Sequence, residues 1–338
     1  MPPFERDSHR IVIAGASSLM GAELKSLLEE SRFAGWDLRL VDEEVAVGTL
    51  TEAGGEPAVI QPVEGGSFDR ARLIFFTGSP EFTRANLKVA ASTNARVIDL
   101  SGAALEDADD APVAAWFPKL DSLRGEESSG DGKLLGVPSA AATATAALAL
   151  ALSKLGLLWM NAVHFLPVSE AGRAGIEELE AQTGKLLSFQ PFGQLVFDTQ
   201  VAFNMLDRFG GGSRQKLQNS VQRIRAEVRA CVGKKVALPA VQVLHAPVFY
   251  GATFSVCAAV DVLAGQKIAE VCRGAEFVIV SEDEARPSNV SLAGEKSIFL
   301  AQPENDPSEM STFWLWGAAD NIRLPAWNAV KLAEKLVP

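Results

Sequence analysis

The stretch that decides the fold is residues 10–30, RIVIAGASSLMGAELKSLLEE. Residues 11–14 form an apolar run that predicts a buried strand, and Gly15 marks a turn directly after it. The segment that follows places Leu24, Leu27 and Leu28 on one face of a helix. A strand that runs through a glycine turn into an amphipathic helix indicates the first half of a βαβ unit, and therefore an α/β protein.

The alternation continues through the first hundred residues. Strand patterns at residues 37–44, 70–78 and 95–102 are separated by helical patterns, of which residues 81–93 are the clearest. Strands and helices in this order favour right-handed crossovers and parallel pairing. We therefore expect a Rossmann-type doubly wound parallel sheet, in a dinucleotide-binding domain formed by residues 1–136.

The pattern changes after this domain. A polar loop is expected at residues 124–133, and then longer strand candidates appear, with a helix at 213–230 between them. We expect residues 137–320 to form an α+β domain with a mostly antiparallel sheet. An amphipathic helix within residues 321–338 should pack back on the first domain. The strand candidates of the second domain are WMNAVHFLPVS, KVALPAVQVLHAPVFY, ATFSVCAAVDVL and EFVIVSE.

Composition excludes several classes of protein. The 338 residues carry 31 Lys and Arg against 42 Asp and Glu, a net charge of −11 that disfavours binding to nucleic acid or to an anionic membrane. The basic residues within 214–229 are interpreted as the solvated face of a helix. Three cysteines without CxxC spacing and three histidines predict neither a disulfide framework nor a metal site. The charged start and the absence of a long apolar run favour a cytoplasmic protein.

Seven short segments, in the same order along nearly the whole chain, resemble the aspartate-semialdehyde dehydrogenase family. They are GASSLMGAEL, FFTGSPEFT with VIDLSGA, GVPSAAAT, VSEAGRAGIEEL, AFNMLDRFG, HAPVFYGATFSV and DNIRLPAWNAVKLAE. The resemblance implies a Cys nucleophile, a His that moves protons, and hydride transfer with NADP. It also implies Arg and Lys groups that bind phosphate and carboxylate, a Gln that orients the intermediate, and a dimer built through the sheet of the second domain.

Each of the catalytic positions that we could match carries a different residue here. The nucleophile position is Ala140, the proton-transfer His position is Ala252 and the Gln position is Leu166. The carboxylate-binding Arg position is His245, and the phosphate-binding Arg position is Leu105. A methyl group can neither attack an aldehyde nor transfer a proton, so no catalytic residue is predicted at these positions.

Relocated chemistry is the alternative. Ser139 and His164 could form a hydrolytic pair, but no carboxylate is placed to orient the imidazole. The simpler prediction makes Ser139 the N-cap of the Ala-rich helix that follows, and His164 a structural histidine. Cys257 should face away from Ala252, because the offset of five residues on a strand is odd. All three cysteines are predicted to be small buried hydrophobes.

The glycine turn is the candidate nucleotide site. Its residues are Gly15, Ser17, Ser18, Leu19, Met20 and Gly21, with Glu43 at the end of the second strand. Ser18 replaces a glycine of the family pattern, and its Cβ could crowd a pyrophosphate. The acids Asp42, Glu43 and Glu44 would repel a 2′-phosphate, and Glu43 and Val45 stand where the family binds that phosphate. These residues favour NAD over NADP if either binds; the alternative is a strand end with solvated acids.

Three functions remain open from the sequence. The first is an inactive relative retained for nucleotide binding or assembly, as a homodimer or together with an active paralogue. The second is an active NAD(P)-dependent semialdehyde oxidoreductase with relocated catalytic residues. The third is a nucleotide-sensing regulator, which differs from the first only in whether the glycine turn is occupied.

Overall fold

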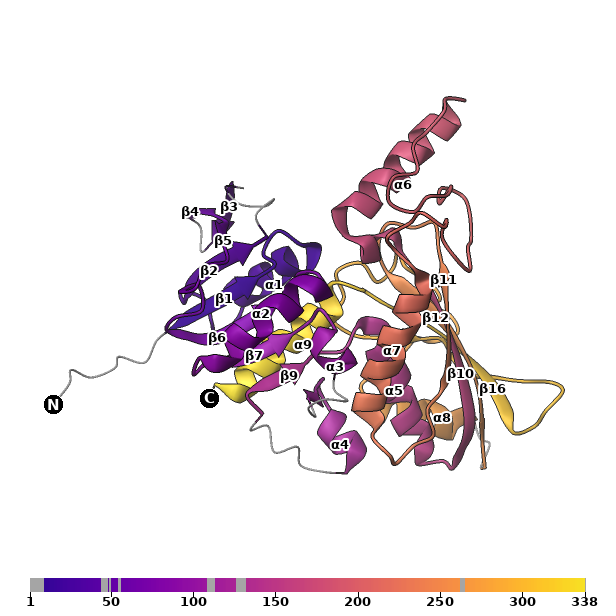
Figure 1. The fold of residues 1–338 in the computed structure, drawn as a ribbon. Coiled ribbons are helices and arrows are strands. Elements are labelled where there is room, and N and C mark those ends of the chain that lie inside the picture. The colour runs from indigo at the N-terminus through magenta and orange to yellow at the C-terminus, as the bar shows by residue number, and fades with distance from the viewer. Residues whose placement is uncertain are drawn as a thin grey trace. The chain divides into compact units, whose positions relative to one another are not determined.

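The structure is a computed structural model that describes residues 9–43, 48, 50–53, 56–107, 113–125, 132–261 and 265–337. The chain divides into two compact units. Unit 1 comprises residues 1–118, 128–137 and 325–338, and unit 2 comprises residues 119–127 and 138–324. Figure 1 shows the elements of each unit, coloured along the chain.

Unit 1 contains a seven-stranded sheet in the order β5-β2-β1-β6-β7-β9-β8, and every pairing in it is parallel. The prediction of a doubly wound parallel sheet is therefore confirmed. A small antiparallel hairpin of β3 (Leu50–Ala53) and β4 (Glu56–Val59) accompanies it. The strands of the main sheet are β1 (Arg10–Ala14), β2 (Asp37–Asp42), β5 (Gln61–Pro62), β6 (Ala71–Phe76), β7 (Arg96–Asp99), β8 (Ala114–Ala115) and β9 (Leu134–Gly136).

Helices cover both faces of this sheet. Successive side chains of β1 therefore pack into two apolar clusters, one on each face. Ile11 and Ile13 lie in one cluster with α1 (Leu19–Glu29) and the C-terminal helix α9 (Arg323–Leu336). Val12 and Ala14 lie in the other cluster, with α2 (Pro80–Ser92). The short helix α3 (Ala103–Glu106) follows β7. The C-terminal residues thus complete the core that the first residues begin.

Unit 2 contains a mixed sheet in the order β11-β10-β12-β16-β14-β13, with β15 also paired to β16. The pairs β10–β11 and β13–β14 are parallel and the others are antiparallel, which confirms the mostly antiparallel sheet. The strands are β10 (Leu157–Leu166), β11 (Ala240–His245), β12 (Ala252–Val260), β13 (Val278–Ile279), β14 (Phe299–Leu300), β15 (Glu304–Asn305) and β16 (Thr312–Ala319).

Helix α5 (Ala140–Ser153) packs against β10, β12, α7 and α8, and its residues 140–152 are all buried. Alanine has the highest helix propensity and small side chains allow close packing on every side, which suits this central position. The N-cap predicted at Ser139 is confirmed: its side chain accepts a hydrogen bond from Ala142 N–H. The other helices of the unit are α4 (Leu120–Arg124), a 3-10 turn (Val168–Ala171), α6 (Gly172–Leu187), α7 (Leu217–Val232) and α8 (Gly265–Gly274).

Several predicted boundaries were wrong. The strand predicted at residues 235–250 is reduced to Ala240–His245. Helix α7 begins at Leu217 and not at residue 213, because Ser213 Oγ donates to Val196 and Gln215 carbonyls and accepts Gln215 N–H, which holds a turn there. The strand predicted at residues 276–282 is reduced to Val278–Ile279. Within the described residues, no helix is long and apolar enough to cross a membrane.

Candidate functional site

The glycines of the turn between β1 and α1 are required by chain packing. Gly15 has φ +95°, and a Cβ there would lie 2.1 Å from the backbone nitrogen of Gly78. A Cβ on Gly21 would lie 2.5 Å from the carbonyl oxygen of Gly15. Any larger residue would push the first helix turn away from the strand ends. The spacing of these glycines is therefore explained by the fold itself, without a bound nucleotide.

Most backbone N–H groups of the turn are already used. Gly15 and Ala16 donate to Val41 O, and Ser17 N–H donates to Asp42 Oδ2 at 2.6 Å. Among the described residues, no acceptor receives the N–H groups of Leu19 and Met20, the first two positions of α1. Such unpaired groups at a helix N-terminus are suited to bind a phosphate oxygen. These two donors are the feature of the turn on which a proposal of nucleotide binding can rest.

Ser18 has a structural role in this turn. It is the N-cap of α1, where Oγ accepts Gly21 N–H at 2.9 Å and donates to Thr77 O at 2.8 Å. These two bonds tie the helix to the loop that follows β6. The side chain whose Cβ we expected to crowd a pyrophosphate is thus held in place by Gly21 N–H and Thr77 O.

The acids at the end of β2 differ in what they contact. Asp42 is buried, and its carboxylate accepts the N–H groups of Ser17 and Glu43, so it closes the turn onto the strand end. Glu43 is exposed and accepts a hydrogen bond from Ser79 Oγ at 3.2 Å. Glu44 and Val45 lie outside the described residues. Among the described acids at this strand end, Glu43 is therefore the one that is exposed to solvent.

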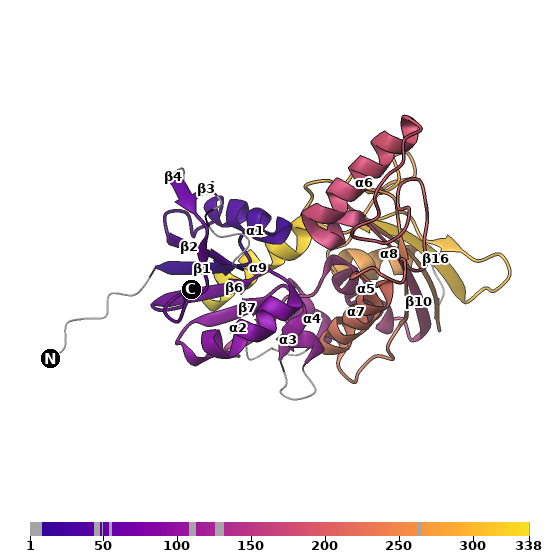
Figure 2. The ribbon, with the colours of Figure 1, turned by 45° about the horizontal axis from the view of Figure 1, so that its top comes forward.

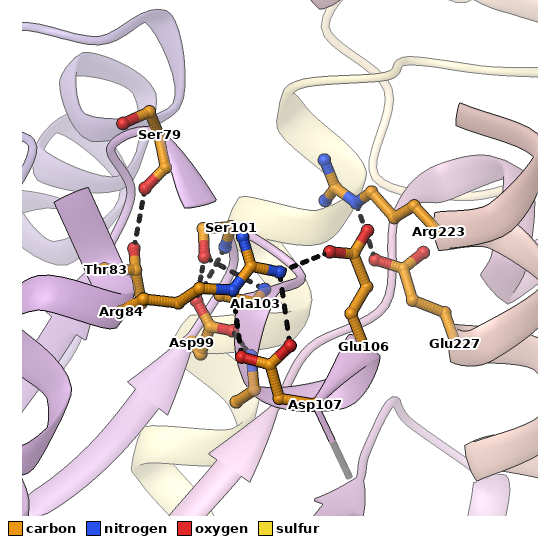
Figure 3. A network of polar contacts seen from close by, with 11 residues as sticks. Ser79, Thr83, Arg84, Asp99, Ser101, Ala103, Glu106, Asp107, Arg223 and Glu227 are labelled. Carbon is orange, nitrogen blue, oxygen red and sulfur yellow. Dashed lines mark hydrogen bonds and ion pairs between the residues drawn. The ribbon is translucent and has the colours of Figure 1, made fainter. Parts of the chain in front are cut away.

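In unit 2, the matched nucleophile position is the first residue of α5. Ala140 is buried there, directly after the cap. The Ser139 hydroxyl donates to Glu227 Oε2 at 2.5 Å, and Ser139 N–H donates to the same oxygen at 3.0 Å. Glu227 is fully buried and pairs with Arg223 at 2.8 Å, as Figure 3 shows. A carboxylate bound on both oxygens in this way fixes the start of α5 in position.

In unit 1, the matched phosphate-binding position, Leu105, is part of the core. Leu105 is buried in α3, and a Cβ on Gly136 would lie 2.4 Å from its Cγ. Beside it, Arg84 binds the carboxylates of Glu106 and Asp107 at 2.7 and 2.9 Å (Figure 3). Two acidic residues, Glu106 and Asp107, thus follow Leu105 in the chain. The Arg84 guanidinium beside them is already paired with both carboxylates. This arrangement disfavours a phosphate.

The buried Asp99 supports the same helix. Its carboxylate accepts hydrogen bonds from Ser101 N–H and Oγ, at 2.8 and 2.6 Å, and from Ala104 N–H at 2.8 Å (Figure 3). Both oxygens are therefore bound within one turn of chain. Asp99 shapes the loop after β7 and leaves no free oxygen for a ligand.

The matched carboxylate-binding position, His245, packs among aromatic rings. Its ring centroid lies 6.0 Å from Phe197 and 5.5 Å from Phe209, and its backbone pairs with Leu206. Burial lowers the pKa of His245, although a hydrogen bond to Val201 O opposes the shift. A neutral, buried imidazole in this setting cannot replace an arginine fork that binds a carboxylate. The matched positions Leu166 and Ala252 are also buried.

The structure gives Ser139 and His164 different partners. His164 is fully buried on β10, with Nε2 2.8 Å from Thr145 Oγ1. Since Thr145 Oγ1 donates to Ala141 O, it accepts from His164, and we assign the Nε2–H tautomer. His164 Nδ1 has no partner among the described residues, and burial lowers the pKa of His164 to about 4. An imidazole held neutral and without an orienting acid is a poor general base.

The environment of the thiols favours their protonated form. Burial raises the pKa of Cys231, and it raises the pKa of Cys272 to about 12. Cys257 faces away from Ala252 as predicted, because residues 252, 254 and 256 are buried and their odd-numbered neighbours are only half-buried. The prediction that Cys257 is buried was wrong: it lies half-buried on the outer sheet face, between Asn161 and Trp314. Burial and the nearby Asp306 nevertheless raise its pKa.

Sequence reasoning missed three polar residues of unit 2. Glu227 was not singled out, although its i,i+4 spacing from Arg223 within an amphipathic helix is a usable signal for an ion pair. Glu170 accepts Asn321 Nδ2–H at 2.9 Å, and Asn321 Oδ1 accepts Gly251 N–H. These contacts join distant segments, so no local pattern predicts them. Among the described residues, no group of three or more His, Cys, Asp or Glu could hold a metal ion.

Comparisons with known proteins agree with one another. Residues 148–324 match the family described as semialdehyde dehydrogenase, dimerisation domain. A USG-1 protein homolog of Pseudomonas aeruginosa is 30% identical over 335 residues, which is 97% of each chain. An aspartate-semialdehyde dehydrogenase of Rickettsia bellii is 25% identical over 97% of this chain and 98% of its own. The solved structure of a probable aspartate-semialdehyde dehydrogenase from Pseudomonas aeruginosa has a TM-score of 0.84 at 27% identity, over 97% of this chain and 98% of that chain.

Proposed function

This chain belongs to the semialdehyde dehydrogenase family, and from that premise we propose that it is an aspartate-semialdehyde dehydrogenase-like protein without catalytic activity, retained for nucleotide binding and dimeric assembly. The resemblance found in the sequence motifs is confirmed by these matches. The observation that carries the proposal is Ala140 at the first position of α5. Its buried methyl group stands where the resemblance implies a thiolate.

Other contacts support inactivity. The two alternative candidates near Ala140 are engaged by other groups: Ser139 caps the helix and is bound to Glu227, and His164 is bound to Thr145. All three thiols have a raised pKa, which keeps them protonated near neutral pH. Covalent capture of an aldehyde needs a nucleophile whose lone pair is free and a base that can take its proton. Glu227 lies within hydrogen-bond reach of Ser139, but its two oxygens are bound by Ser139 and Arg223, and Ser139 Oγ accepts Ala142 N–H, so this pair serves the start of α5.

The test is an absorbance assay at the reduced-nicotinamide band. The purified chain is mixed with aspartate semialdehyde, phosphate and either NAD or NADP, with an active aspartate-semialdehyde dehydrogenase as the positive control. We expect no rate above the protein-free blank. Turnover that scales with the concentration of this chain would refute inactivity and would favour the alternative, an active oxidoreductase with relocated residues.

For nucleotide binding, we propose the turn formed by Gly15, Ser17, Ser18, Leu19, Met20 and Gly21, together with Glu43. The free N–H groups of Leu19 and Met20 fit one phosphate. Glu43 fits ribose hydroxyls and would repel a 2′-phosphate, which favours NAD over NADP. A bound nicotinamide would supply hydride transfer chemistry. The contribution of this chain is to orient the phosphate and ribose, since four of its five matched positions carry hydrocarbon side chains and the fifth is the buried His245.

Isothermal titration with NAD, NADP and adenine nucleotides tests this part. We expect NAD to bind more tightly than NADP, and Glu43→Gln to reduce that preference. Ser79→Ala, which removes the hydroxyl donor to Glu43 and keeps its charge, is the matched control. No heat with any of these nucleotides would remove nucleotide binding from the proposal and leave assembly alone.

We propose that the chain forms a homodimer through the outer face of the unit 2 sheet. Trp159 and Trp314 are 43% and 44% exposed there, and the rings of Phe165 and Trp316 lie 6.0 Å apart. The same face has a hollow of about 250 Å³ with Trp314 and Trp316 in its wall. Exposed tryptophans on a strand face are typical of interfaces. Association with an active paralogue would use the same face.

Sedimentation of the unaltered chain against Trp159→Ser/Trp314→Ser tests the dimer. We expect a dimer that the double variant weakens, and a monomer at all concentrations would refute the dimeric part of the proposal. The net charge of −11 argues against nucleic acid or a membrane surface as the partner, and the three unpaired cysteines fit a cytoplasmic location.

A further inference from the structure

Helix α7 and the residues next to it carry a concentration of positive charge that the rest of the chain lacks. Residues 213–235 contain seven Lys and Arg against one acid, and that acid, Glu227, is buried and paired with Arg223. The remaining residues contain 24 Lys and Arg against 41 Asp and Glu. The net charge of −11 therefore combines a strongly acidic remainder with one basic segment.

One face of α7 is exposed and carries two of these cations. In Figures 1 and 2, α7 lies beside α5 within unit 2, and its apolar side chains at positions 217, 224, 228 and 232 are buried. Gln218, Gln222, Arg225 and Arg229 follow the spacing of a single helix face, and all four are exposed. We call these four residues the α7 stripe. The stripe is about 16 Å long, from the rise of an α-helix.

The two arginines of the stripe have no partner of opposite charge in the part of the chain that the structure describes. Arg223, on another side of the same helix, does have one in Glu227. Like charges four residues apart on a helix repel one another, so Arg225 and Arg229 disfavour the helix that holds them. Arg229 lies in the last turn, where the helix dipole favours a cation, but Arg225 lies a turn earlier, where this benefit has fallen off. A carboxylate from outside the chain would remove the repulsion.

The composition of the stripe favours an acidic protein segment over other anions. An arginine fork binds a carboxylate through two parallel N–H groups, and a glutamine amide donates to carboxylate or carbonyl oxygens. Residues 213–235 contain no aromatic residue on which the bases of a single strand could stack. A nucleic acid duplex longer than the stripe would be repelled by the acidic remainder of the chain. A helix on a membrane surface turns its apolar side chains to the lipid, whereas those of α7 are buried.

We infer that the α7 stripe binds an acidic segment of another protein. Asp and Glu side chains of that segment pair with Arg225 and Arg229, and the amides of Gln218 and Gln222 donate to its remaining oxygens. The charge of the stripe is complementary to such a segment, and a short segment touches the stripe without meeting the acidic remainder of the chain. The stripe shares no residue with the glycine turn or with the outer face of the unit 2 sheet, so this partner is additional to the proposed nucleotide and the proposed second copy.

The experiment measures the fluorescence anisotropy of a fluorescein-labelled oligoglutamate peptide mixed with the full chain at low ionic strength. We expect binding that added salt weakens, and that Arg225→Gln/Arg229→Gln weakens about fivefold, since exposed ion pairs each contribute modestly. Arg225→Lys/Arg229→Lys keeps both charges and should retain most of the affinity. The matched control is Arg72→Gln/Lys88→Gln, which removes two exposed cations of unit 1 and should leave the affinity unchanged.

Three results would overturn the inference. The first is that the peptide does not bind, or that the glutamine variant of the stripe and the control lose the same affinity. The second is tighter binding of a single-stranded oligonucleotide, or of phosphatidylserine vesicles, than of the peptide, which would make the partner class wrong. The third is a lower oligomeric mass of the glutamine variant in sedimentation velocity, which would mean that a second copy covers the stripe. Each of these results leaves the proposals of catalytic inactivity and nucleotide binding unaffected, because they depend on other residues.

Discussion

Acidification should destabilise unit 2 through His164. The imidazole is fully buried on β10, next to Thr145 and 5.7 Å from the ring of Phe254. Its Nδ1 has no partner among the described residues, so a proton added there would place an unpaired charge in an apolar core. Burial lowers the pKa of His164 from its ordinary value of 6.5 to about 4.

The size of the effect follows from these two values. The unfolded chain takes up the proton near pH 6.5, whereas the folded chain takes it up only near pH 4. Because the pKa is lower in the folded state, the stabilisation is fully present above pH 6.5 and is lost as the pH falls toward 4. The full loss is about 3 kcal/mol, and about 1.4 kcal/mol of it is already reached at pH 5.5.

Urea unfolding between pH 8 and 5.5 measures the loss, and this range avoids the acid conditions in which the carboxylates titrate. Over this range, the free energy of unfolding should fall by about 1.4 kcal/mol more for the unaltered chain than for His164→Gln. His9→Gln, at an exposed position of unit 1, should behave like the unaltered chain. Equal pH dependence in the unaltered chain and in His164→Gln would refute the assignment of the effect to this imidazole.

Three further changes test the packing around the site. Gly136→Ala should lower the free energy of unfolding by about 1–3 kcal/mol, because its methyl group would lie 2.4 Å from Leu105 Cγ; adding Leu105→Ala should restore most of the loss in thermal unfolding. Ser139→Ala should cost about 1–2 kcal/mol, since it removes the α5 cap and a donor to Glu227, and a neutral result would contradict the role of the cap. Gln182→Leu should release residues 193–202 from α6, so that limited proteolysis cuts the chain faster within these residues while cleavage elsewhere is unchanged.

The elements that the sequence predicts correctly are those with a local cause. The apolar run of β1 and the leucine spacing of α1 indicate a strand and a helix from local sequence alone, and Ser139 before an alanine run indicates a cap. Boundaries fail where a contact from elsewhere decides them. Ser213 ends its turn through Val196, which is 17 residues away, and no pattern around position 213 reveals that partner.

The candidate site divides in the same way. The positions Ala140 and Ala252 follow from motif matching, because they lie within segments that resemble the family. The partners of the polar groups do not follow from it. Asp42 was interpreted as part of an acidic cluster that could bind ribose, but its carboxylate accepts the N–H group of Ser17. The basic helix face was interpreted as solvated, but its Arg223 pairs with the buried Glu227. The contact of Asp42 depends on the approach of two segments that are 25 residues apart in the chain. The contact of Arg223 depends on which face of α7 is buried.

The distribution of the two cores along the chain has a consequence for synthesis. Unit 1 begins at the N-terminus, yet Ala326, Ala329 and Val330 of α9 are fully buried in its core. Unit 2 needs β16, which pairs with β12, β14 and β15 and ends at Ala319. A ribosome must therefore translate through β16 before the core of unit 2 can close and through α9 before the core of unit 1 can close, so the growing chain depends on protection from aggregation until then.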